Sequence, residues 1–478
     1  MKRRFAARAL GLGLATLVAM GTPARAVDER ELGRRFLLAA RAELPIVQDP
    51  VVAGYVERIG EKLVGVLGPQ SFDYRFYVVQ HPALNAFAVP GGYVFVFSGL
   101  LARVKSDDEL AGVLAHEIGH VSGHHLLRQQ KEGQVWTAAA LLGLLVSAVN
   151  PVLGAAGIAA AETAQLKYSR EFEQEADYLG LRYASEAGYD PHALGSFFKE
   201  LLADQRINSA GVPAYMLTHP LTEDRVANVA TAITSQHLKT PAGRPASGTE
   251  FPEAQAVARA IAEPADVVIG RYRRMADEKP EDAERQFLLG RVYQTVGQLE
   301  AARTALERCR ALGGLDGRVE RPLGTVYVAL KKPAEAREAL GHYLAKHPED
   351  GWSHLQLGKA LADAGDDGGA LKEFQRAISC DPELDEAQRL AGVALGRRGD
   401  EAEGFYRLAV ASRLRGELEQ ALSHFQRTKP LLDPASPRRQ EVDQAIAELL
   451  PLVHERERER LERRRGPRRG VALGGLRP

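Results

Sequence analysis

Four glycines that lie 34 residues apart limit the fold of the second half of this chain more strongly than any other feature. They are Gly290, Gly324, Gly358 and Gly392. A period of 34 residues matches one pair of helices per repeat, and such a pair can bury its apolar face only against its neighbours. We therefore expect a stacked array of helix pairs, an α-solenoid with a concave groove.

The residues around these glycines keep one register through the first three repeats. Leucines precede the glycines, Tyr or Leu follows three residues later, and Ala follows twelve residues later. The members are Leu289, Leu323, Leu357, Tyr293, Tyr327, Leu361, Ala302, Ala336 and Ala370. Small residues at these positions let paired helices approach closely, so the pattern predicts tetratricopeptide repeats. We assign them to residues 253–435 and expect a charged C-terminal tail at 436–478.

The first 26 residues have the features of a secretory signal peptide. A basic start precedes the apolar stretch Ala9–Met20, and Ala24-Arg25-Ala26 is a typical cleavage signal. An uncleaved anchor is the alternative, but the apolar stretch is too short to span ~30 Å of hydrocarbon. We expect a mature, soluble, periplasmic chain that begins near Val27. Both the Sec and the twin-arginine routes of export remain open.

Composition excludes several classes of protein. The chain contains 62 Lys plus Arg and 62 Asp plus Glu, so no overall field attracts nucleic acid or an anionic membrane. Two cysteines, Cys309 and Cys380, cannot build a disulfide framework. The uncharged run Val135–Val149 is shorter than the ~20 residues of a membrane-spanning helix. We expect it to be a buried helix or a lid, with at most peripheral membrane contact.

Residues 27–235 predict a domain of helices with a small β-sheet. Tyr74–Gln80 and Asn85–Ser98 are rich in β-branched and aromatic residues, and Pro90-Gly91-Gly92 marks a turn between strands. An extended polypeptide could add to this sheet if one edge is open to a cleft. The Pro- and Gly-containing stretch 236–252 predicts a linker that makes few contacts with either domain.

Two long helices are expected in this domain. Ser106 and Glu109 form a capping box at the start of the first helix, which should continue to about Gln129. The second helix should run from about Ala161 to Ala187. The fold class is therefore mainly α, with a small sheet in the first domain and a helical solenoid in the second.

The first long helix contains the sequence His116-Glu117-Ile118-Gly119-His120. Histidines at i and i+4 share one face and can both bind Zn²⁺, while Glu117 is placed to act on a water molecule. A catalytic zinc requires a third protein ligand. A histidine six residues after His120 would be that ligand in the metzincins, but Leu126 stands there.

The second long helix offers a carboxylate as the third ligand. Glu173 and Asp177 lie at i and i+4, so one can bind metal while the other orients a ligand imidazole. HEIGH, SRxxExxAD, NAFAVPGGYVFVFSGLL, and Thr218-His219-Pro220 with Arg225 resemble the gluzincin metallopeptidases that include HtpX, the mitochondrial Oma protease and the CAAX-converting proteases. With its signal peptide and repeats, the chain resembles a periplasmic branch of that family.

The resemblance implies a role for each motif residue. His116, His120 and Glu173 would bind one zinc ion, Glu117 would be the general base, and Asp177 would orient a ligand. His219 would be either a transition-state donor or an extra zinc ligand. The neighbouring His124 and His125 are expected to have structural or supporting roles, although His124 could approach the metal.

The resemblance also implies a function. The chain would be a zinc endopeptidase that cleaves misfolded or stalled exported proteins, including outer-membrane proteins. The repeats would dock the unfolded substrate or the β-barrel assembly machinery of the outer membrane. The alternative is a chaperone-like scaffold for outer-membrane protein assembly with little proteolysis, although an intact Glu117 argues against it because metal binding does not need this residue.

Overall fold

The computed structural model describes residues 28–131, 169–207, 214–243 and 247–465, except positions 71, 241 and 314. The predicted signal peptide and the apolar run Val135–Val149 lie outside these residues. None of the helices in the described part of the chain combines the length and the hydropathy that a membrane span requires.

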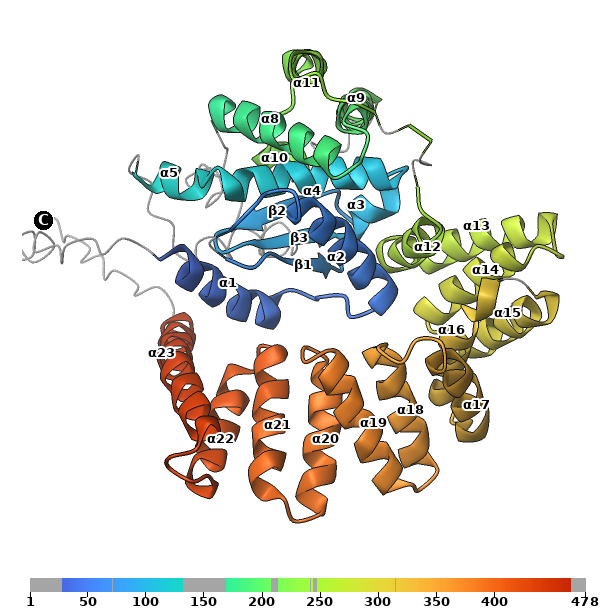
Figure 1. The fold of residues 1–478 in the computed structure, drawn as a ribbon, viewed down its shortest axis with the longest axis vertical. Coiled ribbons are helices and arrows are strands. Elements are labelled where there is room, and N and C mark those ends of the chain that lie inside the picture. The colour runs from blue at the N-terminus through green and yellow to red at the C-terminus, as the bar shows by residue number, and fades with distance from the viewer. Residues whose placement is uncertain are drawn as a thin grey trace, which may run out of the picture.

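The first domain consists of helices around one small sheet. Its helices are α1 (Glu29–Glu43), α2 (Pro50–Val64), α3 (Ser98–Arg103), α4 (Asp107–Ser122), α5 (His125–Lys131), α8 (Arg170–Glu186), α9 (His192–Ile207), α10 (Ala214–Thr218) and α11 (Glu223–Ser235), and its strands are β1 (Arg75–Val79), β2 (Ala86–Val89) and β3 (Tyr93–Phe97). Figure 1 shows α8, α9 and α11 on one side of α4 and the sheet on the other.

The sheet has the strand order β1-β3-β2. β1 runs parallel to β3, and β2 pairs with β3 in the antiparallel direction. The turn between β2 and β3 contains Gly91 and Gly92, whose φ angles of 85° and 87° lie in the left-handed region that favours glycine. The predicted small sheet with a turn at these glycines is confirmed.

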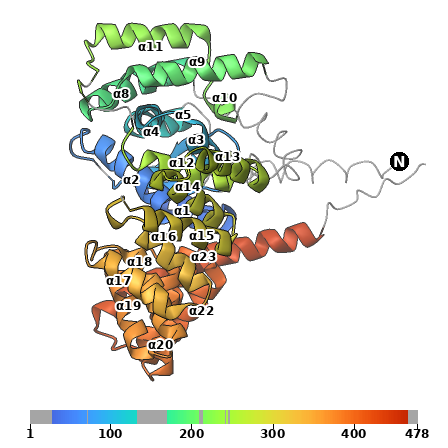
Figure 2. The same ribbon diagram turned by 90° about the vertical axis from the view of Figure 1, so that its right-hand side faces the viewer.

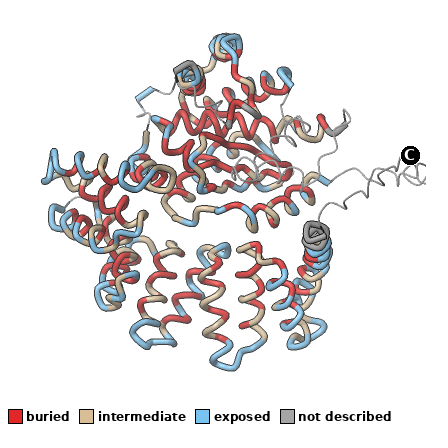
Figure 3. The backbone as a smooth tube through the Cα atoms, turned by 180° about the vertical axis from the view of Figure 1, so that it is seen from behind, coloured by how far each residue is buried: buried red, intermediate tan, exposed pale blue. Residues whose placement is uncertain are grey.

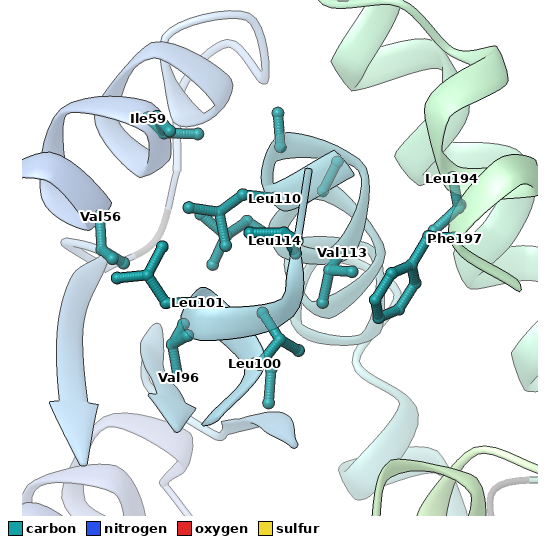
Figure 4. Packing of buried hydrophobic residues seen from close by; sticks show 14 of the residues in the cluster. Val56, Ile59, Val96, Leu100, Leu101, Leu110, Val113, Leu114, Leu194 and Phe197 are labelled. Carbon is teal, nitrogen blue, oxygen red and sulfur yellow. The ribbon is translucent and has the colours of Figure 1, made fainter. Parts of the chain in front are cut away.

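Helix α4 lies at the centre of the main hydrophobic core. Leu110, Val113 and Leu114 are fully buried, and Figure 4 shows them between side chains of α2, α3 and β3 on one side and α9 on the other. At the start of α4, Ser106 Oγ accepts a hydrogen bond from the Glu109 N–H at 3.2 Å. The Glu109 carboxylate accepts one from the Lys105 N–H at 2.7 Å. This predicted cap fixes where α4 begins.

Two helix boundaries differ from the sequence prediction. The helix that begins after Ser106 does not continue to Gln129, because Gly123 ends it and His124 has a φ of +53°, so that α5 is a separate helix. The expected helix from Ala161 begins at Arg170 in the described residues. Ser169 has extended backbone angles there, and its side chain caps the helix by accepting the Phe172 N–H.

The second domain is a curved array of paired helices. They are α12 (Phe251–Ala262), α13 (Ala265–Glu278), α14 (Ala283–Thr295), α15 (Leu299–Leu312), α16 (Glu320–Ala329), α17 (Pro333–Leu344), α18 (Gly351–Asp363), α19 (Asp367–Cys380), α20 (Asp385–Arg397), α21 (Glu401–Leu414), α22 (Leu418–Thr428) and α23 (Pro437–Arg465). Figures 1 and 2 show the array running along one side of the first domain and then beneath it.

The repeated glycines lie where paired helices touch. A Cβ atom on Gly290 would lie 2.6 Å from the Leu306 side chain, and one on Gly324 would lie 2.5 Å from Leu340. A side chain at either position would require the facing leucine to move, so helix packing accounts for the 34-residue glycine pattern. The mainly α fold with a helical-repeat solenoid is confirmed.

The two domains are in contact at both ends of the array. At one end, α12 packs against α3, and its Gln255 and Arg259 side chains donate hydrogen bonds to the backbone oxygens of Val104 and Ala102. The Gly248 N–H also donates to Asp107 at 2.7 Å, so the predicted linker makes more contacts than expected.

At the other end, helix α1 lies against the last helices of the array. Leu38 belongs to a buried cluster with residues of α21, α22 and α23, and Arg34 forms an ion pair with Glu448 of α23. Helix α23 packs through its apolar side and extends the array, although its residues were expected to form a tail.

Figure 3 shows buried residues throughout the first domain and along the packed sides of the repeat helices.

Candidate metal centre

Helix α4 positions three of the predicted site residues. His116, Glu117 and His120 are all at most 3% exposed. The two imidazoles project from the same face of α4, and their Nε2 atoms are 3.0 Å apart. The local spacing along one helix therefore brings two ligand nitrogens together without help from distant parts of the chain.

Helix α8 packs very closely against α4. A Cβ on Gly119 of α4 would lie 2.8 Å from the Ala176 backbone oxygen, and one on Gly180 of α8 would lie 2.9 Å from the His116 backbone nitrogen. Neither position can accept a side chain. This close approach brings Glu173 and Asp177 of α8 to the histidines of α4.

Four residues present one ligand atom each to a common centre. They are His116, His120, Glu173 and His219, all buried, with ligand atoms within 4.8 Å of one another. Glu173 Oε1 lies 3.4 Å from His120 Nε2 and 2.9 Å from His219 Nδ1, and His219 Nδ1 lies 3.3 Å from His116 Nε2. Atoms about 2.05 Å from a tetrahedral zinc ion are about 3.3 Å apart, so these separations fit zinc.

A buried arginine holds the two carboxylates of α8. Arg225 of α11 donates hydrogen bonds to both oxygens of Asp177, at 2.7 and 2.8 Å, and forms an ion pair with Glu173. Burial alone would raise the pKa values of both acids, but His219 and Arg225 keep the pKa of Glu173 well below its usual value. Arg225 and His116 likewise lower the pKa of Asp177. Both groups therefore remain ionised.

Asp177 also contacts a candidate ligand directly. Its Oδ1 atom lies 2.9 Å from His116 Nδ1. This contact leaves the Nε2 atom of His116 directed at the common centre, which is the arrangement of a carboxylate that orients a metal-binding imidazole.

Glu117 lies beside the cluster and does not belong to it. Its carboxylate accepts a hydrogen bond from the backbone of Ala88 in β2, and Oε1 lies 3.5 Å from His219 Nε2. Burial raises the pKa of Glu117, and the nearby His219 and His116 only partly offset this effect. A raised pKa makes the carboxylate a better proton acceptor.

His219 lies inside the cluster, close to both glutamates. Its ring stacks on Tyr215 of α10 with centroids 4.7 Å apart and an interplanar angle of 26°. Burial alone would lower the pKa of His219, but Glu173 and Glu117 raise it. The structure therefore places His219 within reach of the common centre.

Strand β2 runs next to Glu117. Because the Phe97 N–H donates to the Asn85 oxygen, the antiparallel pattern directs the N–H and C=O groups of Ala86 and Ala88 away from β3. This edge therefore faces the cluster. All four residues of β2 are buried in this structure.

One residue of the site, Tyr215, was not singled out by the sequence, whereas His125 was expected to have a structural or supporting role. Tyr215 is fully buried against His219, and its position inside a short helix gives no sequence signal. His125 is also fully buried, and its Nδ1 atom lies 2.9 Å from His120 Nδ1. His124, which was considered as a ligand, is half exposed, and its Nδ1 lies 2.9 Å from Glu29 Oε2.

Comparison with known proteins identifies both domains. Residues 50–233 match peptidase family M48, and residues 283–309 match the tetratricopeptide repeat. The beta-barrel assembly-enhancing protease of Escherichia coli (strain K12) is 32% identical over 225 residues, which cover 45% of this chain and 46% of that protein. The mitochondrial metalloendopeptidase OMA1 of Schizosaccharomyces pombe is 32% identical over 180 residues, which cover 37% of this chain and 51% of that protein.

The chain spans about half the length of these relatives. A solved structure of MamA covers 33% of this chain and 91% of its own at 22% identity, with a TM-score of 0.29. The family match includes the histidines of α4, the carboxylates of α8, and His219 with Arg225. Residues 50–233 therefore match a peptidase domain of family M48, and a tetratricopeptide-repeat match follows at residues 283–309.

Proposed function

We propose that this chain is a zinc-dependent endopeptidase. The observation that carries the proposal is the buried cluster in which His116, His120 and Glu173 converge while Glu117 lies beside them. Two imidazoles and one carboxylate, with a second glutamate nearby, are the residues of a catalytic zinc site that keeps one position for substrate or water.

Zinc held by these three residues would polarise the scissile carbonyl and lower the pKa of water towards ~7. A side chain of the protein carries out the proton transfers. Glu117, whose pKa is raised by burial, takes the proton of the attacking water and passes it to the leaving amine. Asp177 and Arg225 keep the ligand residues ionised and in place.

The edge of β2 supports an extended polypeptide as the substrate. The outward backbone groups of Ala86 and the carbonyl group of Ala88 can pair with such a chain, which would then cross the site beside Glu117, the acceptor of the Ala88 N–H. Backbone pairing gives affinity with little dependence on sequence. We propose non-native exported proteins of the outer membrane as the physiological substrates, which this edge could bind once it becomes accessible.

The repeat array is proposed to dock substrate or an assembly partner. Tetratricopeptide repeats form extended concave surfaces for protein binding, and the array lies beneath the peptidase domain (Figure 1). The predicted signal peptide supports a periplasmic location, where the β-barrel assembly machinery would be a suitable partner.

The proposal is tested with purified protein from Val27 onward. Zinc content and casein digestion are measured with and without a chelator, for the wild type and for Glu117→Gln. We expect about one zinc in both proteins and hydrolysis only in the wild type, because the amide cannot accept a proton. Glu171→Gln, an exposed substitution on α8, is the control and should behave like the wild type.

Two outcomes would contradict the proposal. Cleavage that survives in Glu117→Gln would exclude the assigned base. A zinc-loaded wild type that binds casein without cutting it would instead favour the chaperone-like scaffold.

A further inference from the structure

His125 lies directly behind a candidate zinc ligand. Its ring is fully buried, and its Nδ1 atom is 2.9 Å from Nδ1 of His120. The two rings are nearly perpendicular, at 82°, with centroids 4.9 Å apart. His120 directs its other nitrogen, Nε2, at His116 and Glu173. His125 therefore contacts a ligand of the cluster from the side opposite the common centre.

The break between α4 and α5 is what turns His125 inward. His124 has a φ of +53°, a conformation that is uncommon for residues other than glycine, and its side chain is held outside by Glu29. A Cβ on Gly123 would lie 2.5 Å from His125 Nε2, so only glycine leaves room for this ring. The strained backbone of His124, next to Gly123, indicates that the surrounding structure enforces the position of His125.

Further contacts fix the ring of His125. It stacks on Phe172 of α8 with centroids 4.7 Å apart and an interplanar angle of 20°. Its Nε2 atom lies 3.4 Å from Glu175 Oε2, and Arg128 donates to that same oxygen at 2.7 Å. The ring is thus held on its face by an aromatic side chain and at its outer edge by a carboxylate.

The contact between the two Nδ1 atoms determines where the protons lie. A nitrogen pair at 2.9 Å shares one hydrogen, so one atom donates and the other accepts. If His120 binds metal through Nε2, its proton must be on Nδ1, and His125 Nδ1 must accept it. His125 then carries its own proton on Nε2, facing the Glu175 carboxylate.

We propose that His125 is a positioning residue that fixes the tautomer and orientation of His120 through this chain of contacts to Glu175. The inference rests on the proposed zinc function. His125 is not itself among the residues that converge on the centre. An acceptor on the far nitrogen of a ligand imidazole holds the ring in place and makes it a stronger metal ligand.

The test compares two substitutions at this position in the full chain. His125→Phe keeps a flat ring against Phe172 but has no acceptor for the His120 proton, whereas His125→Gln keeps both an acceptor and a donor. Zinc affinity is measured by competition with a chelator, and the cobalt-substituted proteins are compared by visible absorption. We expect His125→Phe to bind zinc about 10- to 100-fold more weakly and to alter the cobalt spectrum. His125→Gln should recover most of the affinity.

A second pair of variants keeps the proposal testable if His125→Phe does not fold. Glu175→Ala removes the carboxylate behind His125, while Glu171→Ala removes an exposed carboxylate from the same helix. We expect zinc affinity to fall several-fold only in Glu175→Ala.

Wild-type zinc affinity and an unchanged cobalt spectrum in folded His125→Phe would overturn the proposal. Equal affinities for the Glu175 and Glu171 variants would do the same. A wild-type chain that binds zinc without hydrolysing casein would contradict the endopeptidase function, yet the affinity measurements would still decide the role of His125.

Discussion

Asp177 Oδ1 lies 2.9 Å from Nδ1 of His116, and both oxygens of the same carboxylate accept hydrogen bonds from Arg225. The buried Asp177 carboxylate therefore links His116, a candidate zinc ligand, to helix α11, which follows His219 in the sequence. The position of His116 depends on α8 and α11 as well as on its own helix.

Asp177→Asn should weaken zinc binding about 10- to 100-fold, because the amide is a poorer acceptor for the His116 proton and leaves Glu173 as the carboxylate paired with Arg225. Zinc affinity by chelator competition measures the effect. Glu186→Gln makes the same change of charge at an exposed position of α8 and should bind zinc as the wild type does. Equal affinity in Asp177→Asn would show that His116 needs no such partner.

Spacing within one helix predicted part of the site, whereas His219 and Arg225 were expected only from the resemblance to the gluzincin metallopeptidases. His116 and His120, and likewise Glu173 and Asp177, lie at i and i+4, so their shared faces follow from helix geometry alone. The repeat array was predictable for a similar reason, because the 34-residue period records the contact between paired helices at Gly290 and its equivalents.

The missed features depend on contacts between distant segments or on single backbone angles. His125 reaches His120 only because Gly123 ends α4 and His124 takes a positive φ, and no periodic pattern encodes that angle. The contact of α1 with α21–α23 joins residues more than 350 positions apart. The sequence predicted the repeat array over residues 253–435 but assigned the residues of α23 to a tail, and it did not indicate which helices would lie against one another.

Phe251 tests whether the first helix of the array is also part of the peptidase core. Its side chain is 8% exposed and belongs to the same hydrophobic cluster as Val56 and Leu110. Phe251→Ala should lower the free energy of unfolding of the peptidase domain by about 3–5 kcal/mol, the usual effect of emptying a buried aromatic site. Denaturant unfolding monitored with bound zinc measures it.

The exposed Val267 provides the comparison, since Val267→Ala on α13 should leave the free energy of unfolding nearly unchanged.

Truncation tests the same role of α12 in the peptidase core. A chain ending at Glu263 should fold and bind zinc, whereas one ending at Thr249 should unfold at a lower denaturant concentration. Equal stability of the two truncated chains would mean that α12 belongs to the array alone.

Tyr55 should make the protein lose stability in alkali. Its hydroxyl donates to Asp107 Oδ1 at 2.5 Å, and burial, together with the Asp107 charge, raises its pKa well above the usual value. Below pH ~10 both the folded and the unfolded chains keep the Tyr55 proton, so the contribution of this hydroxyl to the free energy of unfolding is fully present. Above that pH only the unfolded chain loses the proton, so this group lowers the free energy of unfolding by about 1.4 kcal/mol per pH unit.

Urea unfolding between pH 9 and 11 checks this prediction. Tyr55→Phe should be less stable than the wild type at pH 9, because the hydrogen bond to Asp107 is lost. Above pH ~10 its free energy of unfolding should fall less steeply with pH, and the difference in slope should correspond to one proton, about 1.4 kcal/mol per pH unit. Tyr178→Phe alters an exposed ring, 48% accessible, and should keep the wild-type slope. An identical slope in the Tyr55 variant would show that this hydroxyl ionises equally in both states.

His219 is proposed to keep the peptidase inactive until substrate engages. Its Nδ1 atom lies among the candidate ligand atoms, at 2.9 Å from Glu173 and 3.3 Å from His116, while its Nε2 faces Glu117 at 3.5 Å. A histidine in this place occupies the position that substrate or water requires and lies against the base. The whole site is also closed, since Glu117 is 1% exposed.

Under this hypothesis, His219→Ala should raise the basal rate of casein cleavage and promote self-digestion, with zinc content unchanged. If His219 instead donates a hydrogen bond to the transition state, the same substitution should lower kcat by ~10²-fold. His192→Ala, which alters an exposed histidine at the start of α9, is the control and should leave the rate unchanged. The two roles for His219 predict changes of opposite sign, so a fall in kcat in a zinc-loaded His219→Ala protein would reject gating and make His219 a catalytic residue.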